Sequence, residues 1–247
     1  PITAEGSYAG VAFLGSAEMR GRDTPSPELE IAARYIADEF RAMGLEPGGE
    51  DGTYFQYFAL QRRALDAEAT TLSVETNGRT TTLTHGEDFF AFAGVPNQIR
   101  TGLIFTGTEI GEQARAAVRD RVAVVYLPGL PSSPDLNRQI QRVRSQAMDA
   151  GAAAVIFVLD PQFPAQDIAR MASLNATPRG LSVGELRDRP LFFVRYAAAQ
   201  TFFGEAGLDL DALRSASGTS PVEFPATTAM LAAPVKVHED ARAANVA

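Results

Sequence analysis

Two short apolar segments and the amphipathic stretch between them constrain the fold of this chain more than any other feature. Residues 121–127 and 153–159 are nearly continuous apolar runs, as expected of strands buried on both faces. The stretch between them repeats apolar residues at helical spacing and ends at Gly151. Strand, helix and strand at this spacing predict parallel pairing through a right-handed crossover, and therefore an α/β fold. The apolar positions of the predicted helix are Leu136, Ile140, Val143, Ala147 and Ala150.

A second local signal predicts a β-hairpin, which gives the α/β class some α+β character. Residues 70–76 and 79–84 are rich in β-branched side chains and flank Asn77 and Gly78. That pair readily takes the positive φ angles of a type I′ turn. Further elements are predicted as a strand at residues 191–196 and short helices at 198–203 and 209–214. The aromatic side chains expected in the core are Phe89, Phe90, Phe92, Phe192, Phe193, Phe202 and Phe203.

The clearest helix is predicted over residues 27–43. Ser26 is a suitable N-cap, and Pro27 suits the first helical position, where its missing N–H costs nothing. Gly44 suits the left-handed position after the last turn. The apolar residues that recur along one face are Leu29, Ala32, Ala33, Ile36, Phe40 and Met43.

Composition excludes several classes of function. The formal net charge is −8, which argues against nucleic acid and against an anionic membrane surface as partners. All but one of the 22 basic residues are arginines, and they are spread along the chain. The absence of cysteine excludes disulfides and thiolate metal sites. No apolar run approaches the length of a membrane span.

Residues 16–58 carry a resemblance to a known family. The residues that carry it are Ser16, Glu18, Met19, Gly21-Arg22-Asp23, Ala32-Ala33, Tyr35-Ile36, Gly44-Leu45-Glu46-Pro47 and Tyr54-Phe55-Gln56. This stretch resembles the opening segment of the di-zinc aminopeptidase and glutamate-carboxypeptidase family. In that family a protease-associated (PA) domain is often inserted before the metal ligands.

The middle of the chain is similar to the PA domain. Residues 118–125 stand in the place of its "kGKivlv" strand, with Asp120-Arg121 where that motif has Gly-Lys. Residues 144–158 stand in the place of its "K…A…GAagvi" helix and strand. The resemblances imply an N-terminal peptidase segment at residues 1–60, a PA-like insertion at 61–229, and a return segment at 230–247 toward a catalytic domain missing from this chain.

The chain offers little for a zinc site. A co-catalytic pair of zinc ions needs about two imidazoles and several carboxylates, and only His85 and His238 are present. His85, near Glu87 and Asp88, is interpreted as an exposed loop histidine. His238-Glu239-Asp240 matches the family's His-x-Asp pattern, but the Glu-Glu, Asp and His ligands that should follow are absent. We therefore predict no catalytic residue and no metal ligand in this chain, with two zinc ions expected in the parent enzyme.

Three residues are candidates for a substrate cleft: Glu18, Arg22 and Asp23. By resemblance their loop packs near the substrate cleft of the catalytic domain, where the fork of Arg22 could anchor a carboxylate. The alternative is a structural ion pair between Arg22 and either Asp23 or Glu18. A metal-free hydrolase that uses Asp23 and Glu18 is a further alternative.

The predicted function is the non-catalytic front part of a zinc aminopeptidase. Its PA domain would shape access of peptide substrates to an active site not present in this chain, which alone should be inactive. The alternative is a freestanding PA-type protein-interaction module without peptidase activity. The resemblance and a chain that starts without methionine suggest a bacterial protein of the periplasm or the exterior. A homodimer is possible through the helix face of Leu29, Ile36 and Phe40, if that face normally packs on the missing domain.

Overall fold

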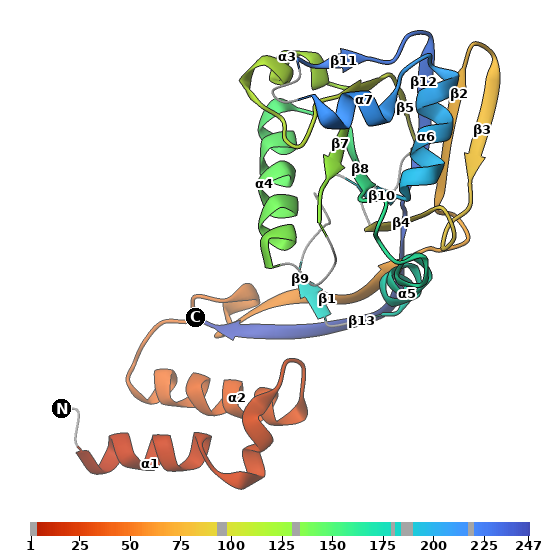
Figure 1. Cartoon of the computed structure of the whole chain (residues 1–247). Coiled ribbons are helices and arrows are strands. Elements are labelled where there is room, and N and C mark those ends of the chain that lie inside the picture. The colour runs from red at the N-terminus through yellow and green to blue at the C-terminus, as the bar shows by residue number, and fades with distance from the viewer. Residues whose placement is uncertain (1–3, 93–97, 130–133, 179–180, 184–189, 217–219) are drawn as a thin grey trace. The chain divides into compact units, whose positions relative to one another are not determined.

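The structure is a computed structural model that describes residues 4–92, 98–129, 134–178, 181–183, 190–216 and 220–247. The chain divides into two compact units (Figure 1). Unit 1 consists of Pro1–Arg62, Gly180–Glu185 and Val237–Ala247, and unit 2 of Arg63–Arg179 and Leu186–Lys236. Among the described helices none is both long and apolar enough to cross a bilayer.

The helix predicted at residues 27–43 is confirmed as α2 in unit 1. It begins where the Ser26 hydroxyl accepts a hydrogen bond from the Leu29 amide at 3.0 Å. It ends before Gly44, whose φ of 74° fits the left-handed position after a last turn. The helical elements of unit 1 are α1 (Ala4–Leu14), η1 (Ala17–Arg22), α2 (Pro27–Ala42) and η2 (Glu50–Gly52).

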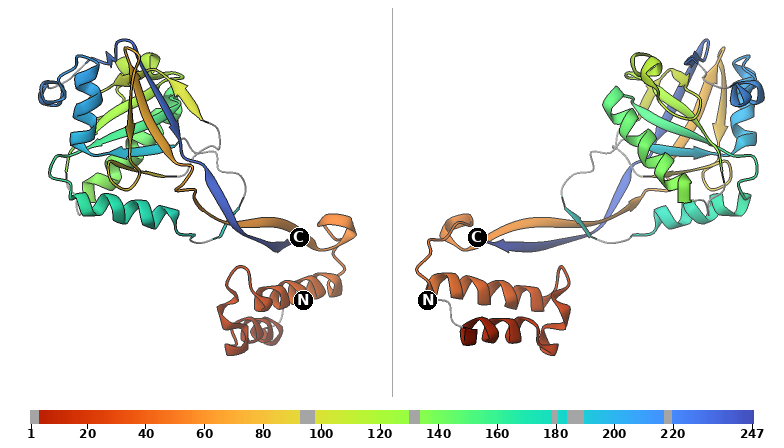
Figure 2. Two further views of the ribbon diagram at one scale, coloured as in Figure 1. Left: turned by 90° about the vertical axis from the view of Figure 1, so that its right-hand side faces the viewer. Right: turned by 60° about the vertical axis from the view of Figure 1, so that its left-hand side comes forward.

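Helix α1 was not predicted. It lies beside α2 (Figure 2), with the rings of Phe13 and Tyr35 4.8 Å apart between centroids. A small residue suits this contact, since a Cβ added at Gly10 would lie 3.3 Å from the Tyr35 hydroxyl, a tight distance. Helix α1 thus contacts α2 through Phe13 and near Gly10, while Tyr8 and Val11 stay exposed.

Unit 1 also holds a sheet in the order β13-β1-β9. Its strands are β1 (Phe55–Leu65), β9 (Leu181–Val183) and β13 (Val235–Val246). The Ala247 amide donates to the Tyr54 carbonyl at 2.9 Å beside the β1–β13 pair. The chain crosses from unit 1 to unit 2 along β1 and back along β13, and residues 180–185, which include β9, also belong to unit 1.

The central sheet of unit 2 has the order β11-β6-β7-β8-β10-β4. The predicted strand–helix–strand unit is confirmed, because β7 and β8 are parallel from Val122↔Ala154 to Leu127↔Leu159 and α4 connects them. Strands β6 and β10 extend this parallel arrangement on either side. The α/β class is thus correct. The elements are β4 (Phe89–Phe92), β6 (Leu103–Phe105), β7 (Val122–Leu127), α4 (Pro134–Ala150), β8 (Ala154–Leu159), β10 (Leu191–Val194) and β11 (Val222–Glu223).

A second sheet in unit 2 has the order β3-β2-β12-β5. Its hairpin is the predicted one, and Asn77 and Gly78 have φ angles of 52° and 79°. The strands are β2 (Thr71–Thr76), β3 (Arg79–Leu83), β5 (Ile99–Thr101) and β12 (Thr227–Ala232). The remaining helices are η3 (Glu112–Ala114), α3 (Arg115–Val118), α5 (Ala165–Ala176), α6 (Tyr196–Glu205) and α7 (Leu210–Ser215).

Alternate residues of the central strands feed two hydrophobic clusters. Val122 and Val124 pack toward the second sheet and α6, whereas Ala123 and Val125 pack toward α4. Figures 1 and 2 show α4 and α6 on opposite faces of the central sheet. The predicted core aromatics are buried except Phe92, for which the prediction was wrong. Phe92 is 38% exposed because it ends β4, the edge strand of the sheet.

Candidate functional sites

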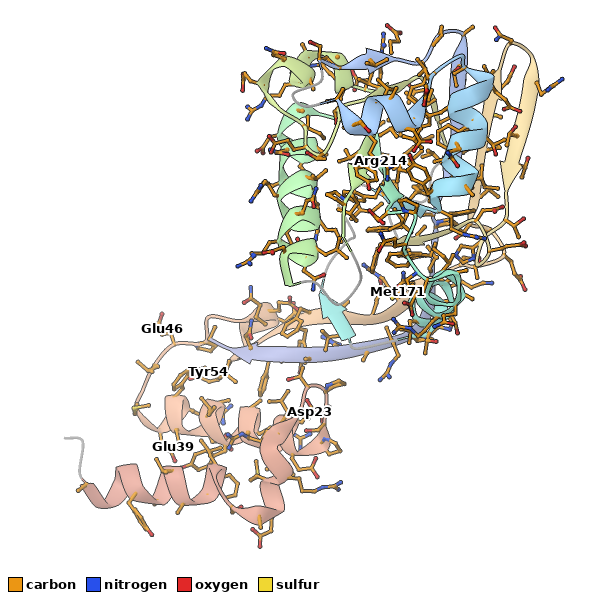
Figure 3. All side chains as sticks on the ribbon, viewed as in Figure 1. Asp23, Glu39, Glu46, Tyr54, Met171 and Arg214 are labelled. Atoms are coloured by element: carbon orange, nitrogen blue, oxygen red, sulfur yellow. The ribbon has the colours of Figure 1, made fainter. Side chains whose placement is uncertain are left out.

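The predicted cleft residues lie together in and just after η1 of unit 1. Glu18 is exposed, and its carboxylate accepts hydrogen bonds from its own amide and from the Ser16 hydroxyl, which lower its pKa. Asp23, labelled in Figure 3, accepts from the Thr24 amide at 2.9 Å. Both carboxylates are thus engaged with neighbouring residues of the loop.

Arg22 is held in a different way. Its φ is 52°, in the left-handed region, and its Nη1 atom is buried with no hydrogen-bond partner in the described part of the chain. The ion pair considered between Arg22 and Asp23 or Glu18 is not formed among these described residues. Instead Arg20 pairs with Glu28 at 3.6 Å. Arg22 therefore takes no part in this ion pair, and its guanidinium keeps hydrogen-bonding capacity.

The two histidines belong to different units. His85 lies in unit 2 and is half-buried, with its ring 5.3 Å from that of Phe89, so the expected exposed loop histidine is wrong. The bend that brings His85 beside Phe89 places it against the core, and burial lowers its pKa. His238 lies exposed on β13, in its unit 1 portion. Within the described ranges no cluster of three or more His, Asp or Glu side chains could hold a metal ion.

Unit 2 contains a hollow of about 680 Å³ that was not predicted from the sequence. It lies at the carboxyl ends of β6 and β7, between the segment that follows β6 and the end of α7. Carboxyl ends of parallel strands are a common place for ligand sites. Thr106, Tyr126 and Arg214 line the hollow, and Figure 3 shows Arg214 on α7.

A polar network surrounds Arg214. The Tyr126 hydroxyl donates to Asp160 and the Tyr196 hydroxyl donates to Asp211, both at 2.7 Å. The Arg214 guanidinium carbon lies 5.8 Å and 5.2 Å from the ring centroids of Tyr126 and Tyr196, within cation–π range. Burial and the aspartate hydrogen bonds raise the pKa of both tyrosines, so both phenols stay protonated donors at neutral pH.

Unit 1 exposes an unusual share of apolar side chains. Of the ten large hydrophobic residues exposed in the described chain, eight belong to unit 1, which has about a third of the residues. They are Tyr8, Val11, Phe13, Ile31, Met43, Leu45, Tyr57 and Val237. The three residues Leu29, Ile36 and Phe40, expected to be under-buried, are half-buried. The main exposed apolar surface therefore includes α1, which the sequence analysis did not predict.

Comparison with known proteins gives structural matches only. No family model matches the chain, and no curated protein matches it significantly. One solved match is BSAP, a zinc aminopeptidase from Bacillus subtilis, at 13% identity over 99% of this chain and 46% of that chain, with a TM-score of 0.36. Another is a peptidase M28 precursor from Shewanella amazonensis SB2B, at 11% identity over 98% of this chain and 50% of that chain, with a TM-score of 0.38. The chain spans about half the length of these structures.

Proposed function

We propose that unit 1 is the front segment of a zinc aminopeptidase domain and that unit 2 is a PA-type domain inserted into it. Residues 16–58 and the two PA-like motifs support this assignment. The neighbouring strands β1 and β13, along which the chain first leaves and finally re-enters unit 1, also support it, since an inserted domain needs closely spaced connections. The role of the chain is then to shape the access of peptides to an active site completed by a separate catalytic part.

The observation that carries the proposal is the exposed apolar surface of unit 1. Large apolar patches on soluble proteins mark surfaces that bind another protein surface. Tyr8 and Val11 lie three residues apart on α1, and so on one face of the helix. We propose that this face packs on the zinc-binding catalytic part.

The residues present do not fit a two-zinc site. Such a site needs convergent imidazoles and carboxylates, whereas His85 and His238 lie in separate units and the described residues contain no ligand cluster. The chain is thus proposed to supply no metal ligand. Its contribution would be Arg22, whose unpartnered Nη1 could donate to a substrate carboxylate beside the cleft. A location in the periplasm or outside the cell belongs to the same proposal.

The test compares the intact gene product with a variant in which a short Gly-Ser linker replaces residues 63–236. Because β1 and β13 are neighbours, this deletion should leave unit 1 connected, and of the unit 1 sheet it removes only the edge strand β9. Measured values of kcat/KM for an aminoacyl p-nitroanilide and for a decapeptide would report access. The proposal expects the ratio of the two values to change by at least about tenfold, since only the long substrate must pass unit 2. An unchanged ratio would overturn the role of unit 2. The control is Arg100→Gln, a substitution on the exposed surface of unit 2 that should leave the ratio unchanged.

A further inference from the structure

We propose that the hollow at the carboxyl ends of β6 and β7 binds a small monocarboxylate ligand through Arg214. This goes beyond the proposed function, since it assigns a ligand site to unit 2 itself. At about 680 Å³ the hollow falls within the range of roughly 300–1,000 Å³ that is usual for small-molecule sites.

Arg214 is positioned to act as the anchor. Its guanidinium lies near the rings of Tyr126 and Tyr196, and it contacts one oxygen of Asp211 at 3.3 Å. A guanidinium has five N–H donors in a planar fork, so these contacts leave donors for a ligand. The side chain is 32% exposed, which makes it accessible from the hollow and yet partly desolvated.

Thr106 supplies a second, independent observation. It lines the hollow and is only 7% exposed, and its hydroxyl has no hydrogen-bond partner in the described part of the chain. A buried hydroxyl without a hydrogen-bond partner is destabilising. A ligand oxygen in the hollow could supply that partner after a rotation of the Thr106 side chain.

The surrounding charges favour a single carboxylate over a more highly charged anion. Asp211 already offsets part of the charge of Arg214, and Glu109 and Glu112 also line the hollow. Glu112 pairs with Arg115 at 3.1 Å, whereas Glu109 is exposed and forms no ion pair within the described residues. Glu109 could therefore receive an ammonium group. The ligand is then either a simple monocarboxylic acid or an amino acid.

Calorimetric titration of the 247-residue chain with three probes tests the site. L-Leucine carries both charges, 4-methylpentanoate lacks the ammonium group, and L-leucinamide lacks the carboxylate. We expect L-leucine to bind and L-leucinamide to bind at least about tenfold more weakly. Equal binding of 4-methylpentanoate and L-leucine would identify a simple carboxylate site. Tighter binding of L-leucine would identify an amino acid site. The proposal is overturned if L-leucinamide binds as well as L-leucine, or if neither L-leucine nor 4-methylpentanoate binds at up to about 10 mM.

Variants locate the binding. Arg214→Gln should weaken it at least about tenfold, while Arg100→Gln, an exposed arginine paired with Glu75 on the second sheet, should leave it unchanged. Since Arg214 also packs against two tyrosine rings, Thr106→Val provides a variant that should fold. It removes the unpartnered hydroxyl, so the melting temperature should stay or rise while binding weakens severalfold. Wild-type affinity in both Arg214→Gln and Thr106→Val would refute the site.

Discussion

Replacing Tyr8 and Val11 by serine should weaken self-association of the 247-residue chain without lowering its stability. Both side chains are on α1 of unit 1, and they are 75% and 71% exposed. Because little of either is buried within the chain, their removal should cost little free energy of unfolding. If the catalytic part normally covers this face, a second copy of the chain can cover it in the isolated protein.

The size of the effect follows from the exposed areas. Complete burial of a valine side chain contributes about 1.5–3 kcal/mol, so Val11 has about 1–2 kcal/mol still to gain. Tyr8 has an aromatic area of roughly 150–250 Å², and burial of half its exposed part adds about 1.5–2.5 kcal/mol at about 25 cal/mol per Å². Allowing for incomplete burial, a loss of about 2 kcal/mol corresponds to roughly a 30-fold increase in the dissociation constant.

Sedimentation equilibrium measures this constant, and urea unfolding measures stability. The matched control is Met148→Ser, which removes an exposed apolar side chain from α4 of unit 2. A strictly monomeric wild-type chain would refute self-association through α1. It is equally refuted if Tyr8→Ser with Val11→Ser associates as tightly as the wild type or Met148→Ser.

Three further predictions concern individual side chains. Ser26→Ala should lower the free energy of unfolding of unit 1 by about 1 kcal/mol, because the cap of α2 is lost. Urea titration followed through the α2 signals measures this free energy, and an unchanged value would contradict the prediction. Arg22→Met should keep or raise the melting temperature, because a buried nitrogen without a partner is removed; a clear fall would reveal a partner. Burial holds the pKa of His85 below its usual 6.5, so the unfolded state binds more protons and stability is lost as the pH falls below about 6.5. The His85→Gln substitution should flatten the dependence of the free energy of unfolding on pH, whereas His238→Gln should not. Equal slopes in the wild type and both variants would show that His85 does not cause the dependence.

The elements predicted correctly are those with local signals. Ser26, Pro27 and Gly44 specify the two ends of α2, and Asn77 with Gly78 specifies the hairpin turn. These signals act over a few residues, so tertiary packing does not override them. The continuous apolar runs of β7 and β8 were equally readable, since strands buried on both faces need no alternation.

Two helices were missed, one without a clear signal and one whose signal was present. Helix α1 contains Gly6 and Gly10, which have low helix propensity, and its apolar residues do not form one clear stripe. Helix α5 did offer Ile168, Met171 and Ala172 at helical spacing, so its pattern was available in the sequence.

The hollow could not be read from spacing along the chain. Thr106, Tyr126 and Arg214 are far apart in sequence, and they meet because β6 and β7 are neighbours and α7 returns beside them. Arg214 is also one of many scattered arginines. By contrast Glu18, Arg22 and Asp23 lie within six consecutive residues, so their grouping can be recognised from the sequence alone.

The most direct test of the account is the zinc content and aminopeptidase activity of two proteins, the 247-residue chain and the product of the whole gene. We expect zinc-dependent release of amino-terminal residues by the whole gene product, and neither stoichiometric zinc nor activity in the 247-residue chain. Stoichiometric zinc with peptidase activity in the 247-residue chain would contradict it. A whole gene product without zinc or activity would also contradict it and would favour a PA-type interaction module.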